Sequence, residues 1–423
     1  MQKLNVFYEN HRVGILTRND DLIYSFTYDG DWIVHSQAFA ISLALPLSAE
    51  TYSNKPTLAF FENLLPEGEV RRTLERHENI ASTFDFLEKF GRDCAGALVI
   101  THEIENNPES QSYGIGREIE LEKIDAAIEQ HQSVAEVLAA IDHGYLSLAG
   151  AQDKFAAIYQ DGKLFIPQGT APTTHIIKVP IWRSDVKESV ANEYYCMELA
   201  RAVGLPVPHC DIIGGRNPLF IIDRYDREVS SVGVVKRLHQ QDFCQAQGIP
   251  SEQKYEDKGG PSIKDNYRLI LTRTPVKSRL KSINIFLDWI SFNLIIGNND
   301  SHSKNISLLM RGTTHEVSPL YDLICTAIYP KLTKQFSFRI GDRNEFSKIG
   351  KNQIDLLEDE IEVRRGTFQK RLNNMSEKIR ENKEKVAKAV LERDSRIKII
   401  PRINDLIDDR IKSLRFQGAI KVS

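Results

Sequence analysis

A run of eight polar residues, from Asn298 to Asn305, interrupts an otherwise apolar part of the sequence. It follows "INIFLDWISFNLIIG" and precedes the short apolar stretch "ISLLM", which we expect to be a strand. Asp300 and Asn305 lie within this run, and Asp322 follows at the end of a second expected strand, "HEVSPLYDLI". Two carboxylates and an amide brought together in this way suit Mg²⁺, which prefers oxygen ligands and is commonly shared with nucleotide phosphates. The alternative is that Asp300 and Asn305 merely cap and turn a loop.

The spacing D-x-x-x-x-N, then a strand pair, then a second Asp, is typical of protein kinases. There the first Asp accepts the hydroxyl proton, while the Asn and the second Asp hold the metal ions. Lys178 stands upstream inside the apolar strand "HIIKV", where an unpaired ammonium would be costly to bury. Glu193 in the following helix is a candidate partner, and the pair would position the α- and β-phosphates. A structural pair at the surface is the alternative.

Two weaker signals complete this arrangement. No G-x-G-x-x-G occurs near residue 150, but "SLAGAQDK", from Ser147 to Lys154, has small residues whose backbone N–H groups could cradle an anion. An ordinary turn is the alternative for this stretch. Asp223 and Tyr225 in "FIIDRYDR" follow an expected strand, at the place where the hinge of a kinase would expose its backbone to adenine.

The elements that must position these residues indicate an α+β fold. Alternating apolar residues in "LNVFY" and "LIYSFTY" predict strands near the N-terminus, and "ASTFDFLEKFG" predicts a helix that stops at Gly91. A hairpin turning at Asp161-Gly162 is expected around "KFAAIYQDGKLFIP". From about residue 230 the pattern becomes mostly helical, and the tail from Gln353 is interpreted as charged helices with solvated faces.

These patterns predict a protein-kinase-like two-lobed fold with three parts. Residues 1–105 form a β-rich N-terminal subdomain, residues 106–228 an N-lobe with the phosphate loop, strand lysine and hinge, and residues 229–423 a mostly helical C-lobe. The length of 423 residues suits several packed units.

Bulk composition limits the function classes. A net charge of −3 argues against a protein that coats nucleic acid, and no helix-turn-helix or arginine-rich arm is evident. The five cysteines are scattered and lack C-x-x-C spacing, which favours a reducing compartment. The N-terminus does not resemble a signal peptide, and the longest apolar run is shorter than a bilayer span. We therefore expect a cytoplasmic protein without a membrane partner.

Several long segments together resemble the HipA family, the serine/threonine kinase toxins of bacterial toxin–antitoxin modules. The matching segments cover nearly the whole chain and include "RVGILT", "FFENLLPEG", "FGRDCAGAL", "SLAGAQDKFA", "HIIKVP", "NEYYCMELA", "RYDR", "DFCQAQGIPSEQKYEDKGGPS", "NNDSHSKNISLL" and "SPLYDL". Two departures from general protein kinases agree with the HipA pattern. Asn298-Asn299 replaces His-Arg before Asp300, and Leu323-Ile324 follows Asp322 in place of Phe-Gly. Any analogy with activation-loop control is therefore unsupported.

The resemblance implies a role for each matching position. Asp300 would be the catalytic base, Asn305 and Asp322 would bind Mg²⁺, and Ser147 would be autophosphorylated, which silences the kinase. A phosphate there adds about −1.5 to −2 charges where the ATP phosphates must lie; a plain loop hydroxyl is the alternative. The residues expected to contact the nucleotide are Ala149, Gly150, Ala151, Gln152, Asp153, Lys154, Lys178, Asp223, Arg224, Tyr225, His302, Ser303, Lys304, Asn305, Tyr321 and Asp322.

The implied function is an ATP- and Mg²⁺-dependent serine/threonine-protein kinase that arrests growth as a toxin. Its implied target is a translation component, an aminoacyl-tRNA synthetase such as glutamyl-tRNA synthetase. The implied partner is a small helix-turn-helix antitoxin resembling HipB, and operator DNA would be contacted mainly through that complex. Two alternatives stay open: a phosphotransferase acting on a small molecule, and a non-catalytic nucleotide-binding regulator. Intact Lys178, Asp300, Asn305 and Asp322 argue against the second.

Overall fold

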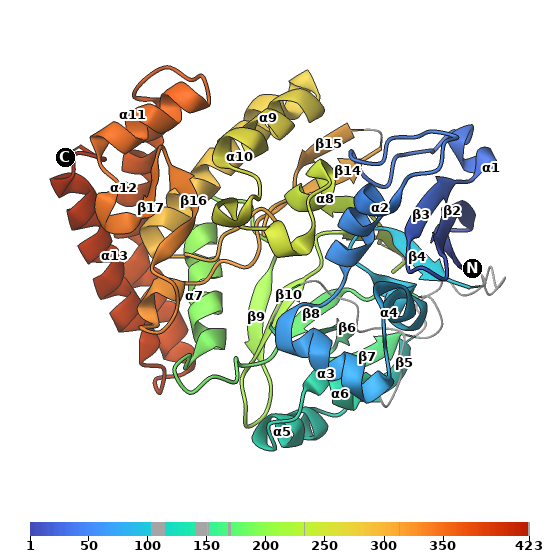
Figure 1. Cartoon of the computed structure of the whole chain (residues 1–423). Coiled ribbons are helices and arrows are strands. Elements are labelled where there is room, and N and C mark those ends of the chain that lie inside the picture. The colour runs from blue at the N-terminus through green and yellow to red at the C-terminus, as the bar shows by residue number, and fades with distance from the viewer. Residues whose placement is uncertain are drawn as a thin grey trace. The chain divides into compact units, whose positions relative to one another are not determined.

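The structure of the chain is a computed structural model that describes residues 1–102, 115–139, 150, 152–167, 171–231, 233–312 and 314–421. The chain forms two compact units: unit 1 is Met1–Val179, Ile213–Ser251 and Leu308–Thr314, and unit 2 is Pro180–Ile212, Glu252–Ser307 and His315–Ser423. Both units combine helices with strands (Figure 1), so the predicted α+β class is confirmed. The predicted boundaries at residues 105 and 228 divide the chain differently and stay a prediction.

Unit 1 begins with a four-stranded antiparallel sheet in the order β3-β2-β1-β4. Side chains alternate in burial along β3, with Tyr24, Phe26 and Tyr28 inward, as the period of two in a strand requires. The elements of this part are β1 (Gln2–Tyr8), β2 (His11–Arg18), β3 (Tyr24–Tyr28), α1 (Gly30–Ile33), α2 (Asn54–Phe61), η1 (Glu62–Leu64), α3 (Gly68–Glu78), α4 (Thr83–Phe90), η2 (Gly91–Asp93) and β4 (Leu98–Thr101).

A second antiparallel sheet of unit 1 has strands β5, β7, β6, β8 and β10 in succession. The predicted hairpin is confirmed: β6 and β7 are joined by Asp161 and Gly162, both with positive φ (51° and 79°), the conformation that an Asp-Gly turn provides. The elements are β5 (Ile115–Ile119), α5 (Leu121–Glu129), α6 (Val134–Ala139), β6 (Lys154–Gln160), β7 (Lys163–Pro167), β8 (His175–Lys178) and β10 (Leu219–Asp223).

After residue 230 helices outweigh strands, as predicted, but short strands that were not predicted interrupt them. In unit 1 they are β11 (Arg227–Val229), β12 (Val235–Arg237) and β13 (Gln240–Asp242), followed by α8 (Phe243–Gln247). β14 (Ser307–Arg311) and β15 (Thr314–Val317) carry the chain from unit 2 into unit 1 and back, in a sheet ordered β13-β14-β15.

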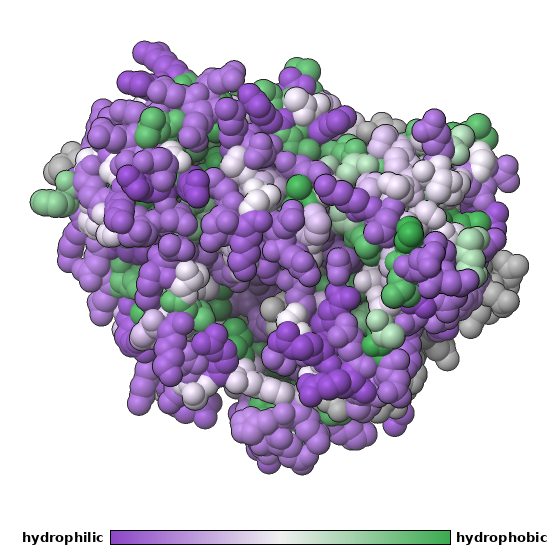
Figure 2. Space-filling model, viewed as in Figure 1, coloured by the Kyte–Doolittle hydropathy of each residue, from purple (hydrophilic) through white to green (hydrophobic). Residues whose placement is uncertain are grey.

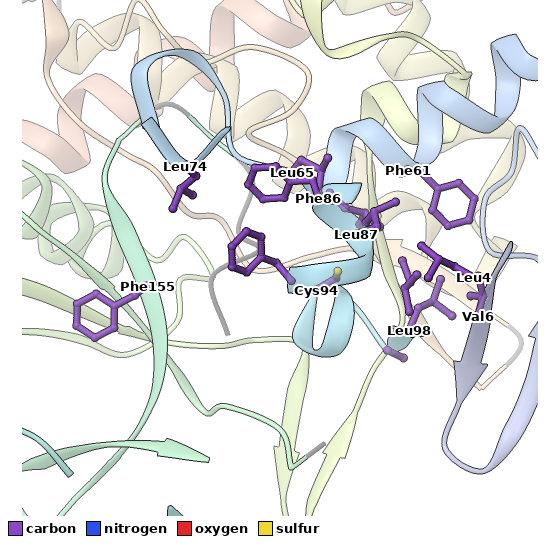
Figure 3. Close-up of a cluster of buried hydrophobic side chains, with 14 of the residues drawn as sticks. Leu4, Val6, Phe61, Leu65, Leu74, Phe86, Leu87, Cys94, Leu98 and Phe155 are labelled. Atoms are coloured by element: carbon purple, nitrogen blue, oxygen red, sulfur yellow. The ribbon is translucent and has the colours of Figure 1, made fainter. Parts of the chain in front are cut away.

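A continuous apolar core holds unit 1 together. In Figure 3, Leu4 and Val6 of β1 and Leu98 of β4 face Phe61 of α2 and Leu87 of α4. All five side chains are buried at 2% exposure or less. Burial of apolar surface on this scale is the main stabilising contribution to the unit.

A buried ionic network in unit 1 joins two of the segments that resemble HipA, "FGRDCAGAL" and "RYDR". The Asp93 carboxylate accepts from Arg224 Nη1 at 3.0 Å, from Arg227 Nη2 at 2.8 Å and from Arg237 Nη2 at 3.1 Å. Asp226 accepts two further bonds from Arg224, at 3.0 and 2.9 Å. Burial alone would raise the pKa of Asp93, but the three guanidinium groups outweigh burial and hold that pKa well below its ordinary value.

Unit 2 is mainly helical. Helices α7 and α12, α10 and α12, and α12 and α13 pack against one another, and Figure 1 shows α12 and α13 side by side in orange and red. The elements are α7 (Ser189–Ala202), β9 (Cys210–Ile213), η4 (Ser251–Gln253), η5 (Glu256–Lys258), α9 (Ile263–Arg273), α10 (Val276–Ile296), η6 (Thr326–Ile328), β16 (Gln335–Ile340), β17 (Arg343–Glu345), η7 (Phe346–Lys348), α11 (Lys351–Glu360), α12 (Thr367–Arg393) and α13 (Ile399–Phe416).

The charged tail is helical, as predicted. In α12, Phe368, Leu372, Met375 and Ile379 recur at intervals of three and four residues and are buried, while the residues between them are mostly more exposed. None of the helices in the described ranges has the length and apolar composition needed to cross a membrane. The face of the molecule in Figure 2 is mostly polar, with hydrophobic residues in small patches.

The buried network predicts a specific dependence of stability on pH. Replacing Asp93 by Asn leaves three guanidinium groups without their common carboxylate, so we expect the free energy of unfolding of unit 1 to fall by about 3–5 kcal/mol at pH 7. Because the pKa of Asp93 is depressed in the folded state, the wild-type advantage is fully present above about pH 4 and is lost as the pH falls further. Urea denaturation across this range measures both effects.

Asp20 provides the control for this substitution, because its carboxylate is 98% exposed and pairs with the N-terminal amine rather than with the buried arginines. Asp20→Asn should leave unfolding unchanged at every pH. An Asp93→Asn variant as stable as the wild type at pH 7 would show that the network contributes nothing.

Candidate active site

The polar run from Asn298 begins where α10 ends. Gly297 adopts a left-handed conformation (φ 78°) and its N–H bonds to Asn293 O, a common way of ending a helix. The polar residues that follow are buried rather than solvated, with Asn298 1% and Ser301 0% exposed. Buried polar groups must be hydrogen-bonded, so the question raised by the sequence becomes where these bonds go.

The side chain of Asn298 connects three segments of unit 2. Its amide nitrogen donates to Asn293 Oδ1 at 2.9 Å and to the backbone oxygen of Asp322 at 3.2 Å. Its amide oxygen accepts from the backbone N–H of Asp300 at 3.2 Å. One buried amide therefore ties the end of α10 to the backbone of both aspartates.

Asn305 completes this arrangement from the other end of the loop. Its amide nitrogen donates to the backbone oxygen of Asp300 at 3.0 Å, and its N–H donates to His302 O at 2.8 Å. With the nitrogen used in this way, the amide oxygen of Asn305 is the atom left for a cation. The structure thus brings Asp300, Asn305 and Asp322 into one hydrogen-bonded assembly.

The backbone at Asp322 is not that of a strand end, as was predicted. β15 ends at Val317, so Asp322 lies in the irregular segment after the strand rather than at its end. Ser318-Pro319 explains the early end, because proline cannot donate a hydrogen bond to a strand ladder. Asp322 has φ 59°, a left-handed conformation that is uncommon outside glycine. Such a conformation persists only where surrounding contacts enforce it, and the bond from Asn298 is one of them.

Neighbouring side chains fix the rest of the loop. Tyr321 Oη donates to Lys304 O at 2.9 Å and shares a 2.7 Å hydrogen bond with Ser307 Oγ. Ser303 Oγ accepts from Asn266 on α9 at 2.9 Å. Tyr321 and Ser303, which were predicted to contact nucleotide, therefore also anchor the loop.

Tyr255 is a residue of this site that sequence reasoning missed. Its phenol donates to Asp300 Oδ1 at 2.5 Å, and its ring lies edge-on to His302 with centroids 5.0 Å apart. Tyr255 stands in the matching segment "EQKYEDKGGPS", but no spacing rule relates it to Asp300. The resemblance of that segment to the HipA family was the only feature of the sequence that could have pointed to Tyr255.

The donors suit a hard divalent cation. Carboxylate and amide oxygens are the ligands that Mg²⁺ prefers, and Mg²⁺ commonly keeps waters and phosphate oxygens as its other ligands. Within the described residues, no three His, Cys, Asp or Glu side chains gather into a metal-binding group. An ion held by Asn305 and Asp322 would therefore depend on the oxygens that a nucleotide brings.

Unit 1 contains the predicted phosphate-binding residues. Strand register pairs Lys178 of β8 with Lys154 of β6 on one side and with Phe220 of β10 on the other. Directly paired residues face the same side of a sheet, so the two lysines lie on one face. Lys178 is buried, with its Nζ 5.9 Å from the centre of the Phe220 ring. Two adjacent ammonium groups on one face favour an anion there.

The stretch before Lys154 makes structural contacts. Gly150 has φ 114°, and an added Cβ would lie 2.5 Å from Lys154 Nζ, so a larger residue would displace that lysine. Gln152 Nε2 donates to Val179 O at 2.8 Å. Asp153 Oδ2 accepts from the N–H of Val134 at 2.8 Å. Ser147, Ala149 and Ala151 lie outside the described residues.

The predicted hinge residues have distinct environments. Asp223 is half exposed and lies 3.1 Å from His175 Nε2, and the Tyr225 hydroxyl bonds to Gln240. Arg224 is buried in the ionic network, so its side chain has a structural role. Its backbone N–H bonds to Thr174 O and its backbone oxygen accepts from Arg227, so its role as a hinge stays a prediction. Lys178 belongs to unit 1 and its candidate partner Glu193, also buried, belongs to α7 in unit 2, so their pairing stays a prediction.

Comparison with known proteins identifies the family. The family model of the HipA-like C-terminal domain matches residues 146–390, more than half of the chain, and that of the HipA N-terminal domain matches residues 4–101. The chain belongs to the HipA family. These two matches include the polar run from Asn298 to Asn305, the strand lysine Lys178 and the ionic network.

Relatives and a solved structure agree with this HipA assignment. Y4mE of Sinorhizobium fredii, named as a candidate kinase, is 34% identical over 88% of this chain and 89% of its own. The serine/threonine-protein kinase toxin HipA of Shewanella oneidensis is 27% identical over 84% of this chain and 82% of its own. A Shewanella oneidensis structure of HipA with HipB and operator DNA matches with a TM-score of 0.82 at 25% identity, covering 98% of both chains. The chain is thus a HipA-type kinase, and kinases use ATP with metal ions.

The role of Asn298 can be tested by Asn298→Asp, which keeps the shape and removes both donors. The new carboxylate would face the oxygens of Asn293 and Asp322, so we expect the free energy of unfolding of unit 2 to fall by about 2–3 kcal/mol. Thermal denaturation measures the change. Asn382→Asp is the control, because that exposed amide donates only to the nearby Lys378 O. Equal stability of the two variants would contradict the assigned role of Asn298.

Proposed function

We propose that this HipA-family kinase transfers the γ-phosphate of ATP to a serine or threonine of a protein, with Asp300 as base and with Mg²⁺ held by Asn305 and Asp322. We further propose that it is the toxin of a toxin–antitoxin pair. The supporting observation is the single hydrogen-bonded assembly of Asp300, Asn305 and Asp322 within unit 2. These bonds hold the backbones of Asp300 and Asp322 and the amide of Asn305 together, and residues with oxygen ligands gathered in this way support a cation site.

The chemistry assigns one task to each group. Asp300 orients the acceptor hydroxyl and takes its proton as the hydroxyl oxygen bonds to the γ-phosphorus, while the bond from phosphorus to the β–γ bridging oxygen breaks and ADP leaves. Mg²⁺, when bound, neutralises charge on the phosphate oxygens. Asn305 and Asp322 fix where that ion lies, and His302, Ser303 and Lys304 shape the loop between the base and Asn305.

The phosphates of ATP are proposed to bind at the lysine pair of unit 1. Lys154 and Lys178 stand side by side across β6 and β8, and their positive charge favours an anionic phosphate on this face of the sheet. The backbone of Gly150 and its neighbours Ala149, Ala151, Gln152 and Asp153 would cover the phosphates, with the segment Asp223 to Tyr225 at the adenine.

The base can be tested by Asp300→Ala. We expect transfer of radiolabel from [γ-³²P]ATP to protein to fall by about 10²–10⁴-fold, because that is the usual contribution of general base catalysis. ATP affinity, measured by calorimetry, should change little, because the carboxylate acts on the acceptor. Asp409→Ala, which removes an exposed carboxylate of α13, should leave transfer intact. Full transfer by the Asp300→Ala variant would refute the assignment.

The partners proposed for this chain come from its family. The solved HipA of Shewanella oneidensis was crystallised with HipB and operator DNA. We propose a helix-turn-helix antitoxin of that kind for this chain, with operator DNA contacted mainly through the complex. The proposed target is an aminoacyl-tRNA synthetase, glutamyl-tRNA synthetase in particular, and the proposed means of silencing is autophosphorylation of Ser147.

Mapping of modified residues tests the target and the silencing together. After incubation with ATP and Mg²⁺, mass spectrometry should find one phosphate on Ser147, and the Ser147→Ala variant should lack it and stay active longer. Added glutamyl-tRNA synthetase should become phosphorylated by the wild type and not by the Asp300→Ala variant. Phosphate on other residues alone, with Ser147 and the synthetase unmodified, would overturn both proposals while leaving the kinase assignment standing.

A further inference from the structure

The segment that carries Tyr255 is a compact loop of unit 2 between η4 and η5. The carbonyl of Tyr255 accepts from the N–H groups of Lys258 at 3.0 Å and Gly260 at 2.9 Å. Gly260 admits no larger residue, because an added Cβ would lie 2.0 Å from Gln253 O. Glu256 Oε2 accepts from the N–H of Arg339 at 2.8 Å, which attaches the loop to β16. The backbone of Tyr255 is therefore fixed from several directions.

The side chain of Tyr255 ends on the proposed catalytic base. Its phenol donates to Asp300 Oδ1 at 2.5 Å, a short charge-assisted hydrogen bond. The ring lies edge-on to His302, whose own N–H bonds to Asp300 O. Tyr255 thus restrains the carboxylate of Asp300, and His302, which contacts the Tyr255 ring, restrains its backbone oxygen.

Two ammonium groups flank the same ring. Lys254 Nζ lies 5.5 Å and Lys258 Nζ 5.3 Å from the ring centre of Tyr255, within the range of cation–π attraction. Cations beside a phenol make its hydroxyl a stronger hydrogen-bond donor. This environment favours the geometry in which Tyr255 donates and Asp300 accepts.

We propose that Tyr255 is a positioning residue for phosphoryl transfer. It ties Oδ1 of the Asp300 carboxylate to a fixed phenol and so presents Oδ2 to the acceptor hydroxyl. This inference rests on the proposed function, because it needs Asp300 to be the base. A carboxylate can rotate about its bond to Cβ, and rotation away from the acceptor would slow the proton transfer without loosening ATP.

The test uses the full chain and separates kcat from KM. Tyr255→Phe keeps the ring and removes the donor, so we expect kcat for transfer from [γ-³²P]ATP to myelin basic protein to fall about 10- to 100-fold. KM and Kd for ATP should stay within about threefold of wild type, because the change affects the acceptor side. Tyr194→Phe is the matched control: its hydroxyl also makes a 2.5 Å hydrogen bond to a charged group, Arg393, yet it should leave kcat unchanged.

A double-mutant cycle distinguishes positioning from a general structural effect. With Asp300→Asn already present, adding Tyr255→Phe should lower kcat no further, because the partner through which Tyr255 acts has been changed. Rates are normalised to the fraction of chain that binds ATP, so partial unfolding does not imitate the result. An equal further loss in the Asp300→Asn background, or a Tyr255→Phe variant with wild-type kcat, overturns the inference. A wild-type chain that transfers nothing overturns the proposed function and this inference with it.

Discussion

The candidate site depends on one buried amide, the side chain of Asn298. Its two donors and one acceptor are all engaged, and they connect the end of α10, the backbone of Asp300 and the backbone of Asp322. A buried amide whose partners were removed would cost free energy, so these bonds favour one arrangement of the loop over all others. The left-handed backbone of Asp322 is maintained partly by this amide. The polar run after α10 is therefore a preorganised interior rather than a surface loop.

In unit 1, buried charged groups fix the arrangement of the chain as the buried amide does in unit 2. Asp93 and Asp226 neutralise most of the charge of three arginines, of which Arg224 and Arg227 are buried, and together they connect "FGRDCAGAL" to "RYDR". Both segments resemble the HipA family as the polar run from Asn298 does, yet their charged side chains serve the fold. Arg224 is the clearest case: it was predicted to contact nucleotide, and its guanidinium bonds to Asp93, Asp226, Thr173 Oγ1 and Cys94 O. A distinctive charged motif can thus mark a structural network.

Much of the fold was predictable because local chemistry determines it. Asp161-Gly162 specifies a tight turn, and the alternation in β3 specifies a strand with one buried face. Asp300 and Asn305 were predictable because the distance between them is short in sequence. Tyr255 was not, since it meets Asp300 only after the chain has formed α9 and α10. The strand pair β16–β17 was missed because "FSFRI" lies in a region whose overall pattern is helical, and that pattern outweighed the strand signal of the segment.

The central claim is that folding alone gathers Asp300, Asn305 and Asp322 into a place for a divalent ion and a nucleotide. The most direct measurement is electron paramagnetic resonance of Mn²⁺ added to the chain with a non-hydrolysable ATP analogue. The account predicts that the wild type binds Mn²⁺ when the analogue is present, and that Asn305→Ala and Asp322→Ala each weaken this binding at least about tenfold. Undiminished Mn²⁺ binding by both variants would contradict it.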